Sequence, residues 1–358
     1  MPEIPASNDE VTTLSANSDL REAIRVHERI HGPSPLFAEL LRENPVWSRP
    51  SVHRAILRDG EIAALSSLAT WDQRFGETTL KVGEIGLVGT APEHRNRGLS
   101  RALMEALLDI MQAEGYALAY LFGIPRFYER WDFHYAAPDH IYPYLRARAG
   151  IVEPFAAHAT WVRPMDERRD LPAVMRIAEE DHSCLPCSPV RPEALWQHLL
   201  AKADTHGVDW LVAVDAADRP RGYLRIKRWA DGICPHPAGA PTDVAIVDAD
   251  AARAIAGYLH RHLASVGHQE LAICLASHGR FGSWLHRHGA MRGRNNRIYP
   301  GSWAAMYRII DLARALSAWV PDWRRRCAEV RPFHDMSLTL RAGKDDLAVA
   351  TVTVHHDK

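Results

Sequence analysis

The chain has 358 residues, a length that predicts two or three domains. It carries 43 Lys and Arg and 44 Asp and Glu, which gives a formal net charge of −1 at pH 7. Because basic residues are scattered and no apolar run reaches the roughly 20 residues of a membrane span, composition supports neither a nucleic-acid nor a membrane partner. The polar, acidic start lacks secretory-signal features and five cysteines make no disulfide framework, so we expect a reduced, cytoplasmic protein.

The first half of the chain alternates strands and helices. Strands are expected at residues 10–15, 53–58, 61–72, 78–90 and 117–122. Helices are expected at residues 20–30, 99–114 and 126–131. The pair Asp59-Gly60 indicates a hairpin turn. The long helix should bury one stripe of side chains, namely Leu99, Leu103, Ala106, Leu107, Ile110 and Met111. This order predicts a mixed α+β layered fold.

The second half repeats this order more weakly. Helices are expected at residues 173–180, 192–201, 251–265 and 281–287, and strands at residues 210–215, 222–229, 244–247 and 271–276. Two tandem copies of one architecture explain this pattern better than one large domain.

A third, small α/β unit is expected at the end of the chain. It would hold a helix at residues 306–319 that continues over 323–330, and two strands at 336–341 and 347–354. A segment of this size cannot build much of a core alone, so it must lean on the others. We therefore expect domains at residues 1–150, 151–303 and 304–358.

The strongest chemical signal is a loop between a strand and the long helix, at residues 84–101. Gly98 removes a side chain where backbone must come close to a ligand, and Ser100 keeps the next position small. Free amides at the helix start, together with the helix dipole, can then bind a pyrophosphate. Arg95, Arg97 and Arg101 add positive charge. The alternative is a basic loop that contains a glycine by chance.

The loop resembles the cofactor signature of the GNAT N-acetyltransferases. Arg95-x-x-Gly98-x-Ser100 is similar to R/Q-x-x-G-x-G/A, and Val88 and Pro92 fit the lead-in of that family. The resemblance implies acetyl-CoA as co-substrate, bound by strand and loop backbone. The implied contact residues are Leu87, Val88, Thr90, Arg95, Asn96, Arg97, Gly98, Leu99, Ser100 and Arg101.

Residues 127–133 resemble the F-Y-x-x-x-G-F segment of the same family, in which the tyrosine is commonly the general acid. That resemblance assigns the acid to Tyr128, and Asp132 stands where glycine is usual. A phenol with a pKa near 10 can donate to a leaving thiolate. The alternative is that Tyr128 is a packing aromatic.

Glu84 is the candidate base, eleven residues before Arg95. This spacing resembles that of the glutamate base in some GNAT histone acetyltransferases, and the carboxylate could accept the amine proton directly or through water. A solvated strand carboxylate is the simpler alternative. An amine site could be lined by Trp71, Asp72, Phe75 and Trp131.

The whole layout resembles the Eis family, which has a catalytic GNAT domain, a second GNAT-like domain without a working cofactor loop, and a domain like sterol carrier proteins. Residues 243–250 pass straight into a helix without an Arg-x-x-Gly-x-Gly loop, and Leu285 stands where the second copy would place its tyrosine. Residues 306–312 resemble the opening of the sterol-carrier-like domain. In that family the third domain is longer and its terminal carboxylate serves as a base, a role that is not carried over to Lys358.

These features predict an acetyl-CoA-dependent N-acetyltransferase that works by direct attack in a ternary complex. The acceptor would be a primary amine, either a small molecule such as a polyamine or aminoglycoside, or a lysine. The alternative is a sensor that binds CoA or a hydrophobic ligand without turnover. Cys184, Cys187 and His182, with Cys234 and His236, outline a zinc site but lack normal ligand spacing, so no metal is expected. A homo-oligomer is left open.

Overall fold

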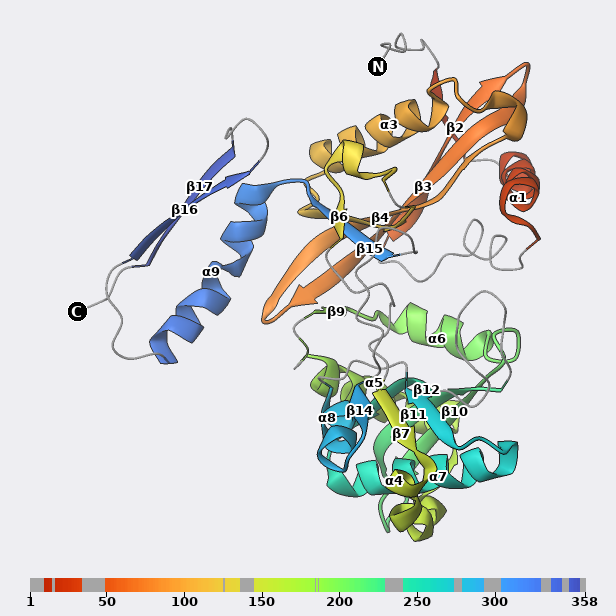
Figure 1. Cartoon of the computed structure of the whole chain (residues 1–358), viewed down its shortest axis with the longest axis vertical. Helices are drawn as coiled ribbons and strands as arrows, with labels where there is room; N and C mark the ends of the chain where they lie inside the picture. The colour runs from red at the N-terminus through yellow and green to blue at the C-terminus, as the bar shows by residue number, and fades with distance from the viewer. Residues whose placement is uncertain are drawn as a thin grey trace. The chain divides into compact units, whose positions relative to one another are not determined.

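The computed structural model describes residues 10–14, 17–33, 49–124, 126–135, 145–183, 185, 187–228, 241–273, 279–292, 304–329, 336–342 and 348–354. Contacts divide the chain into two compact units, one of Met1–Ala136 with Ala305–Lys358 and one of Ala137–Ala304 (Figure 1). The boundaries thus differ from the expected 150 and 303, and residues 305–358 group with the first unit.

The first unit is built on one twisted sheet. Its strands are β1 (Val11–Thr13), β2 (Arg49–Arg58), β3 (Glu61–Phe75), β4 (Thr78–Thr90), β5 (Leu118–Gly123), β6 (His134–Tyr135) and β15 (Ala304–Ile309). They lie in the order β1-β2-β3-β4-β5-β15-β6. Strands β1 to β4 are antiparallel neighbours and β5 is parallel to β4. Asp59 and Gly60 both have positive φ, 52° and 84°, the conformation of the expected hairpin turn.

Two helices cover opposite faces of this sheet, α1 (Asn17–His31) and α3 (Leu99–Ala113) (Figure 1). Ala55 and Leu65 are partners across β2 and β3 and pack with α1, whereas their neighbours Ile56 and Ala64 pack with α3. This alternation follows from the two-residue period of strands. The buried stripe of α3 is close to the expected one and consists of Leu99, Leu103, Met104, Leu107, Leu108 and Met111.

The segment after residue 304 corrects one expectation. Residues 306–310 were expected to begin a helix, but Ala304–Ile309 form β15, and the helix α9 spans Leu312–Glu329. Met306 is fully buried, and a Cβ on Gly123 of β5 would overlap its sulfur. The apolar pattern of residues 305–310 is compatible with both a helix and a strand. The strand forms because it can pair with β5, where the missing side chain of Gly123 leaves room for Met306.

Helix α9 packs on the hairpin that joins β3 and β4. The Trp319 ring lies 5.8 Å from that of Phe75, and the Thr78 hydroxyl donates to the carbonyl of Ala318 at 2.7 Å. Asp322 is buried beside this turn and accepts hydrogen bonds from Arg325 and Arg326. The hairpin of β16 (Met336–Ala342) and β17 (Ala348–Val354) completes the unit.

The second unit has the antiparallel order β12-β11-β10-β8 and a separate three-stranded sheet β13-β7-β14. Its strands are β7 (Leu145–Arg148), β8 (Val162–Pro164), β9 (Ser188–Pro189), β10 (Val208–Val214), β11 (Pro220–Lys227), β12 (Pro241–Ile246), β13 (Glu270–Ile273) and β14 (Met291–Arg292). Its α-helices are α4 (Ala149–Val152), α5 (Glu167–His182), α6 (Glu193–Ala201), α7 (Ala249–Val266) and α8 (Arg280–Arg287). The succession β10-β11-β12-α7-β13 follows the same order as β2-β3-β4-α3-β5 in the first unit.

The core of the second unit lies around α7. A Cβ on Gly257 would overlap the carbonyl oxygen of Phe155, so glycine is what lets α7 approach the 3-10 helix of Glu153–Trp161 this closely. Among the described helices of the whole chain, none has both the length and the apolar character to cross a membrane.

Candidate active site

The two central strands of the first unit separate partway along their length. β4 and β5 pair only from Val82 to Glu84 on β4 and from Leu118 to Tyr120 on β5. Both strands continue beyond this ladder, β4 to Thr90 and β5 to Gly123. The backbone groups that would otherwise pair are therefore available along β4, where an extended ligand could pair with them.

A bulge in β4 lies just beyond the point of separation. Leu87 has a φ of 53°, which is rare for a non-glycine residue. The register between β3 and β4 shifts here, since Leu65 pairs with Gly89 but Ser67 pairs with Gly86. A bulge bends its strand and re-aims backbone groups. The expected contact residues Leu87, Val88 and Thr90 therefore lie on the distorted part of β4, beyond its pairing with β5.

The loop after β4 leads through a 3-10 turn (Pro92–His94) into α3. Asn96 and Gly98 adopt the left-handed conformation, with φ of 62° and 81°. No side chain caps α3, and the backbone amides of residues 96–100 have no hydrogen-bond acceptor within the described part of the chain. A Cβ on Gly98 would meet nothing within 4 Å. Five successive open amides at a helix N-terminus form a ready anion site.

Charge and side chains around the loop fit an anionic ligand. Arg95, Arg97 and Arg101 are exposed at the loop and the first turn of α3. The Ser100 hydroxyl lies 2.9 Å from that of Thr90, so the small residue at this position joins the end of β4 to the start of α3. The structure thus brings all ten expected contact residues to the end of β4 and the start of α3.

Glu84 occupies the last rung of the ladder between β4 and β5. Its side chain is partly buried, and burial raises the pKa of the carboxyl to about 7. No charged or hydrogen-bonding neighbour among the described residues contributes to this shift. A carboxyl group with a pKa near 7 at the start of an open slot has the property that a general base needs at neutral pH.

A group of aromatic residues, not predicted from the sequence, lies beside the strand register of Glu84. Tyr120 is its partner on β5, and the Tyr120 ring lies 5.5 Å from that of Trp71 and 5.0 Å from that of Tyr307. Strand alternation places Trp71, Glu84 and Tyr120 on one face. Tyr307 could not be included from the sequence because residues 306–310 were expected to be helical.

Only one member of the expected amine site joins this group. Trp71 lies beside Tyr120, whereas Phe75 packs against Trp319 at the far end of the hairpin. Trp131 instead belongs to the cluster around Tyr128. No contact places Asp72 with either group among the described residues.

Tyr128 follows β5 as the N-cap residue of a 3-10 turn, Glu129–Trp131. It is 5% exposed, and its ring contacts those of Phe127, Trp131 and Phe133. Burial raises the pKa of its hydroxyl to about 12, so the phenol is fully protonated at neutral pH. It packs with Ile85 in the cluster beneath α3, on the face opposite Glu84 because successive strand residues alternate. Glu84 and Tyr128 thus lie on opposite faces of the sheet.

Asp132 adopts the left-handed conformation that the expected glycine would provide, with a φ of 56°. Aspartate is one of the few side chains that tolerate this region. The turn that holds Tyr128 is therefore formed without the glycine.

The corresponding junction in the second unit has no such opening. Asp248 caps α7, and its carboxylate accepts hydrogen bonds from the amides of Asp250 and Ala251. The same carboxylate pairs with Arg221 at 2.5 Å. The helix start is thus occupied by the chain's own anion. Leu285, the expected counterpart of Tyr128, is fully buried in α8.

Residues 13–136, about a third of the chain, match the family model described as an acetyltransferase (GNAT) domain. This stretch is a GNAT acetyltransferase domain. The protein is therefore an acyltransferase, and domains of this kind use acyl-CoA donors and amine acceptors. No curated protein matches the sequence.

Solved structures match nearly the whole chain at low identity. A probable N-acyltransferase from Enterococcus faecalis is similar with a TM-score of 0.66 and 14% identity, covering 98% of this chain and 83% of that one. A GCN5-related N-acetyltransferase from Anabaena variabilis has a TM-score of 0.69 and 15% identity, covering 97% and 83%. Eis1 from Mycobacterium abscessus has a TM-score of 0.55 and 17% identity, covering 86% and 75%. These likenesses show a shared fold.

The expected absence of a metal stays a prediction. Cys184, Cys234 and His236 lie outside the described residues, and Cys187 is exposed. Within the described ranges no three His, Cys, Asp or Glu side chains gather as a metal site would require.

Proposed function

We propose that the first unit transfers an acetyl group from acetyl-CoA to a primary amine, with Glu84 as the base and Tyr128 as the hydrogen-bond donor. The observation that carries this proposal is the combination of an open amide cradle and a carboxyl with a pKa of about 7 on the same strand-loop-helix segment. The co-substrate supplies the acetyl group as a thioester. The residues of this chain bind it, orient it and move one proton.

The amides of residues 96–100 would hold the pyrophosphate, supported by the charge of Arg95, Arg97 and Arg101. The edge of β4 around Leu87, Val88 and Thr90 that β5 leaves open would pair with the amide-containing arm of the co-substrate. That arrangement brings the thioester to the slot between Glu84 and Tyr128.

An amine attacks only when neutral, so a proton must leave it. Glu84 is about half ionised at pH 7 because its pKa is near that value, and it can accept this proton directly or through one water. The rings of Trp71, Tyr120 and Tyr307 line the same face and suit a cationic amine before it loses its proton.

Tyr128 acts best as a donor that keeps its proton. Its pKa of about 12 lies roughly three to four pH units above that of an ordinary thiol. Full transfer to the leaving thiolate would be uphill, whereas a hydrogen bond to the developing negative charge stabilises it without that cost. This refines the role of general acid expected from the sequence.

We further propose that the second unit is a GNAT-like copy that no longer binds the co-substrate, and that α9 with the β16–β17 hairpin is an abridged sterol-carrier-like element, as in the Eis family. The order of elements and the self-capped start of α7 support the first part. A helix followed by an antiparallel pair of strands supports the second.

The test is to incubate the full chain with acetyl-CoA and a panel of polyamines, aminoglycosides and lysine peptides while following thiol release. We expect release that requires both substrates and no burst without amine, because direct attack forms no acyl-enzyme. Tight CoA binding without release for any amine would support the sensor alternative instead.

A further inference from the structure

The last turn of helix α1 lies against the end of β4, where the bulge is. Three successive residues of this turn make the contact. Arg29 pairs with Glu93 of the turn after β4, with Nη2 and Oε1 2.8 Å apart. A Cβ on Gly89 would lie 2.8 Å from Ile30 Cδ1 and 3.6 Å from His31 Nε2. The missing side chain of Gly89 therefore lets the end of α1 approach the strand.

The bulge needs support from its surroundings. The positive φ of Leu87 is a strained conformation, which persists only where neighbouring groups hold it. Leu87 packs in the same cluster as Ile30 and the buried side chains of α1, whereas Ile85 and Val88 pack in the cluster beneath α3. The bulge thus turns one residue of β4 toward the face that α1 covers and keeps its neighbours toward α3.

His31 makes a polar contact with the bulge. Its imidazole is hydrogen-bonded to the backbone of Val88, directly after the strained residue. This bond raises the pKa of His31, as a bond to a carbonyl acceptor does. Burial and the charge of Arg95 act the other way and leave the pKa below its usual value. The ring is therefore neutral at pH 7, with one N–H that donates to the Val88 carbonyl.

The ring of His27 orients the imidazole of His31. The two rings stack with their centroids 5.7 Å apart and their planes at 25°. His27 is fully buried, and burial lowers its pKa to about 3, so it stays neutral throughout the physiological range. A buried neutral ring on one side and the strand backbone on the other thus hold His31 in place, although it lies at the exposed end of α1.

We propose that His31 is a positioning residue for the arm of the acyl-CoA, and that it acts by holding the peptide unit between Val88 and Gly89. A peptide unit is planar, so a bond that fixes the Val88 carbonyl also fixes the Gly89 N–H. This unit lies beyond the pairing of β4 with β5, on the stretch along which the arm would run. The inference rests on the proposed acetyl-CoA site and concerns its arm alone.

Two ligands separate the arm from the pyrophosphate. CoA contains both, whereas ADP has the pyrophosphate and lacks the arm. In calorimetric titration of the full chain, His31→Ala should weaken CoA binding by about threefold to tenfold, the effect of one lost neutral hydrogen bond, and leave ADP binding unchanged. KM for acetyl-CoA should rise by the same factor, while KM for the amine stays the same. Equal weakening of CoA and ADP, or no weakening of CoA, would overturn the proposal.

Two further variants distinguish the hydrogen bond from general packing of α1. Glutamine can place an N–H near the position of the imidazole Nε2, so His31→Gln should bind CoA more tightly than His31→Ala does. Arg25→Ala is the matched control, since Arg25 is exposed on the same helix and belongs to none of the three contacts, and it should bind CoA as the wild type does. A glutamine variant as weak as the alanine variant would contradict the hydrogen bond. An equal loss in Arg25→Ala would show that α1 acts only through its packing.

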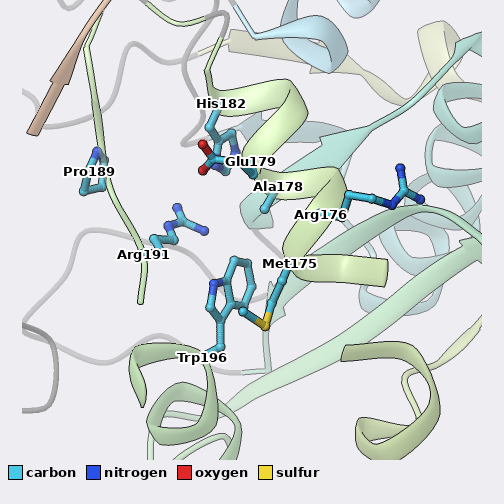
Figure 2. Close-up of a pocket in the computed structure, with 8 residues that line it drawn as sticks. All are labelled: Met175, Arg176, Ala178, Glu179, His182, Pro189, Arg191 and Trp196. Carbon is cyan, nitrogen blue, oxygen red and sulfur yellow. The ribbon is translucent and has the colours of Figure 1, made fainter. Parts of the chain in front are cut away.

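The nucleotide must also be located. The second unit contains a pocket of about 270 Å³, lined among others by His182, Arg191 and Trp196 (Figure 2), which is another place where ADP could bind. Gly98→Ala should weaken both ligands, because both place their pyrophosphate at the start of α3. Undiminished ADP binding in that variant would put the nucleotide elsewhere and overturn the proposal.

These binding measurements do not depend on turnover. A wild-type chain that binds CoA but acetylates no amine would refute acetyl transfer, and the comparison of CoA with ADP in His31→Ala would still decide the role of His31. A wild-type chain that binds neither CoA nor ADP would overturn both proposals.

Discussion

Replacing Glu84 with glutamine should make the protein less active and more stable. The substitution keeps the shape of the side chain but removes both its charge and its ability to accept a proton. Because the carboxyl lies on the last paired rung of β4 and β5, the backbone geometry of the slot should not change. Function and stability are therefore expected to move in opposite directions.

The size of the stability effect follows from the raised pKa. Glu84 has a pKa of about 7 in the fold against a model value of 4.5, so the folded protein holds a proton that the unfolded chain has already lost between these values. Stability is full below pH 4.5 and is lost as the pH rises to about 7. A difference of about 2.5 units corresponds to at most roughly 3 kcal/mol, reduced by the partial exposure of the side chain. Glu84→Gln should therefore raise the free energy of unfolding at pH 8 by much of this amount, and should leave it unchanged at pH 4.

The assay combines denaturant unfolding with steady-state kinetics. We expect kcat/KM to fall by about 10² to 10⁴, the usual worth of a general base, and the wild-type rise of kcat/KM near pH 7 to disappear. Ionisation of the acceptor amine, with a pKa near 10 for a lysine, affects both proteins equally and cancels in the comparison. Wild-type kcat/KM in the variant would refute the role of Glu84, and an unchanged free energy of unfolding at pH 8 would refute the inferred burial cost.

Three other substitutions test the neighbouring parts. Tyr128→Phe should lower kcat by about tenfold to a thousandfold. The circular dichroism spectrum and the melting temperature should stay nearly unchanged, since the ring keeps its packing. An unaltered kcat would show that Tyr128 takes no part in the chemistry. Gly98→Ala places a side chain at a φ of 81°, which should cost about 1–2 kcal/mol and raise KM for acetyl-CoA more than KM for the amine. Asp248→Ala removes the cap of α7 and should cost about 1–2 kcal/mol in denaturant unfolding, while calorimetry should still find one CoA site per chain. A second site in that variant would show that the cap alone blocks the second unit.

The features that the sequence could predict are those set by local chemistry. Asp59-Gly60 forms the expected turn because both residues accept positive φ. Four of the six expected residues of α3 are buried as their spacing indicates, whereas Ala106 and Ile110 are only partly buried. The order of strands and helices in the GNAT domain is confirmed. The helix start at Gly98 could also be inferred, since small residues and an absent cap are visible in the sequence.

The features that it could not predict depend on distant partners. Leucine rarely adopts positive φ, so nothing local indicates the bulge at Leu87. The strand at residues 304–309 exists because β5, far earlier in the chain, offers an edge and a glycine to fit Met306. The raised pKa of Glu84 arises from tertiary burial alone, and Tyr307 reaches its ring partners only through β15.

The two strand-to-helix junctions show why a glycine at one position does not by itself make a cofactor site. Asp248→Gly would free the amides of α7, but the second unit would still lack three features of the first. Its helix start has no cluster of arginines like residues 95–101. Its strands β12 and β13 belong to different sheets and form no slot between paired parallel strands. The register shift between its β11 and β12 lies at Arg225 and Ile226, opposite the start of β12 and not at the end that leads into α7. We therefore expect binding of the co-substrate to require the open cap, the bulge and the split strands together, and among the described residues these three coincide in residues 84–101 and β5.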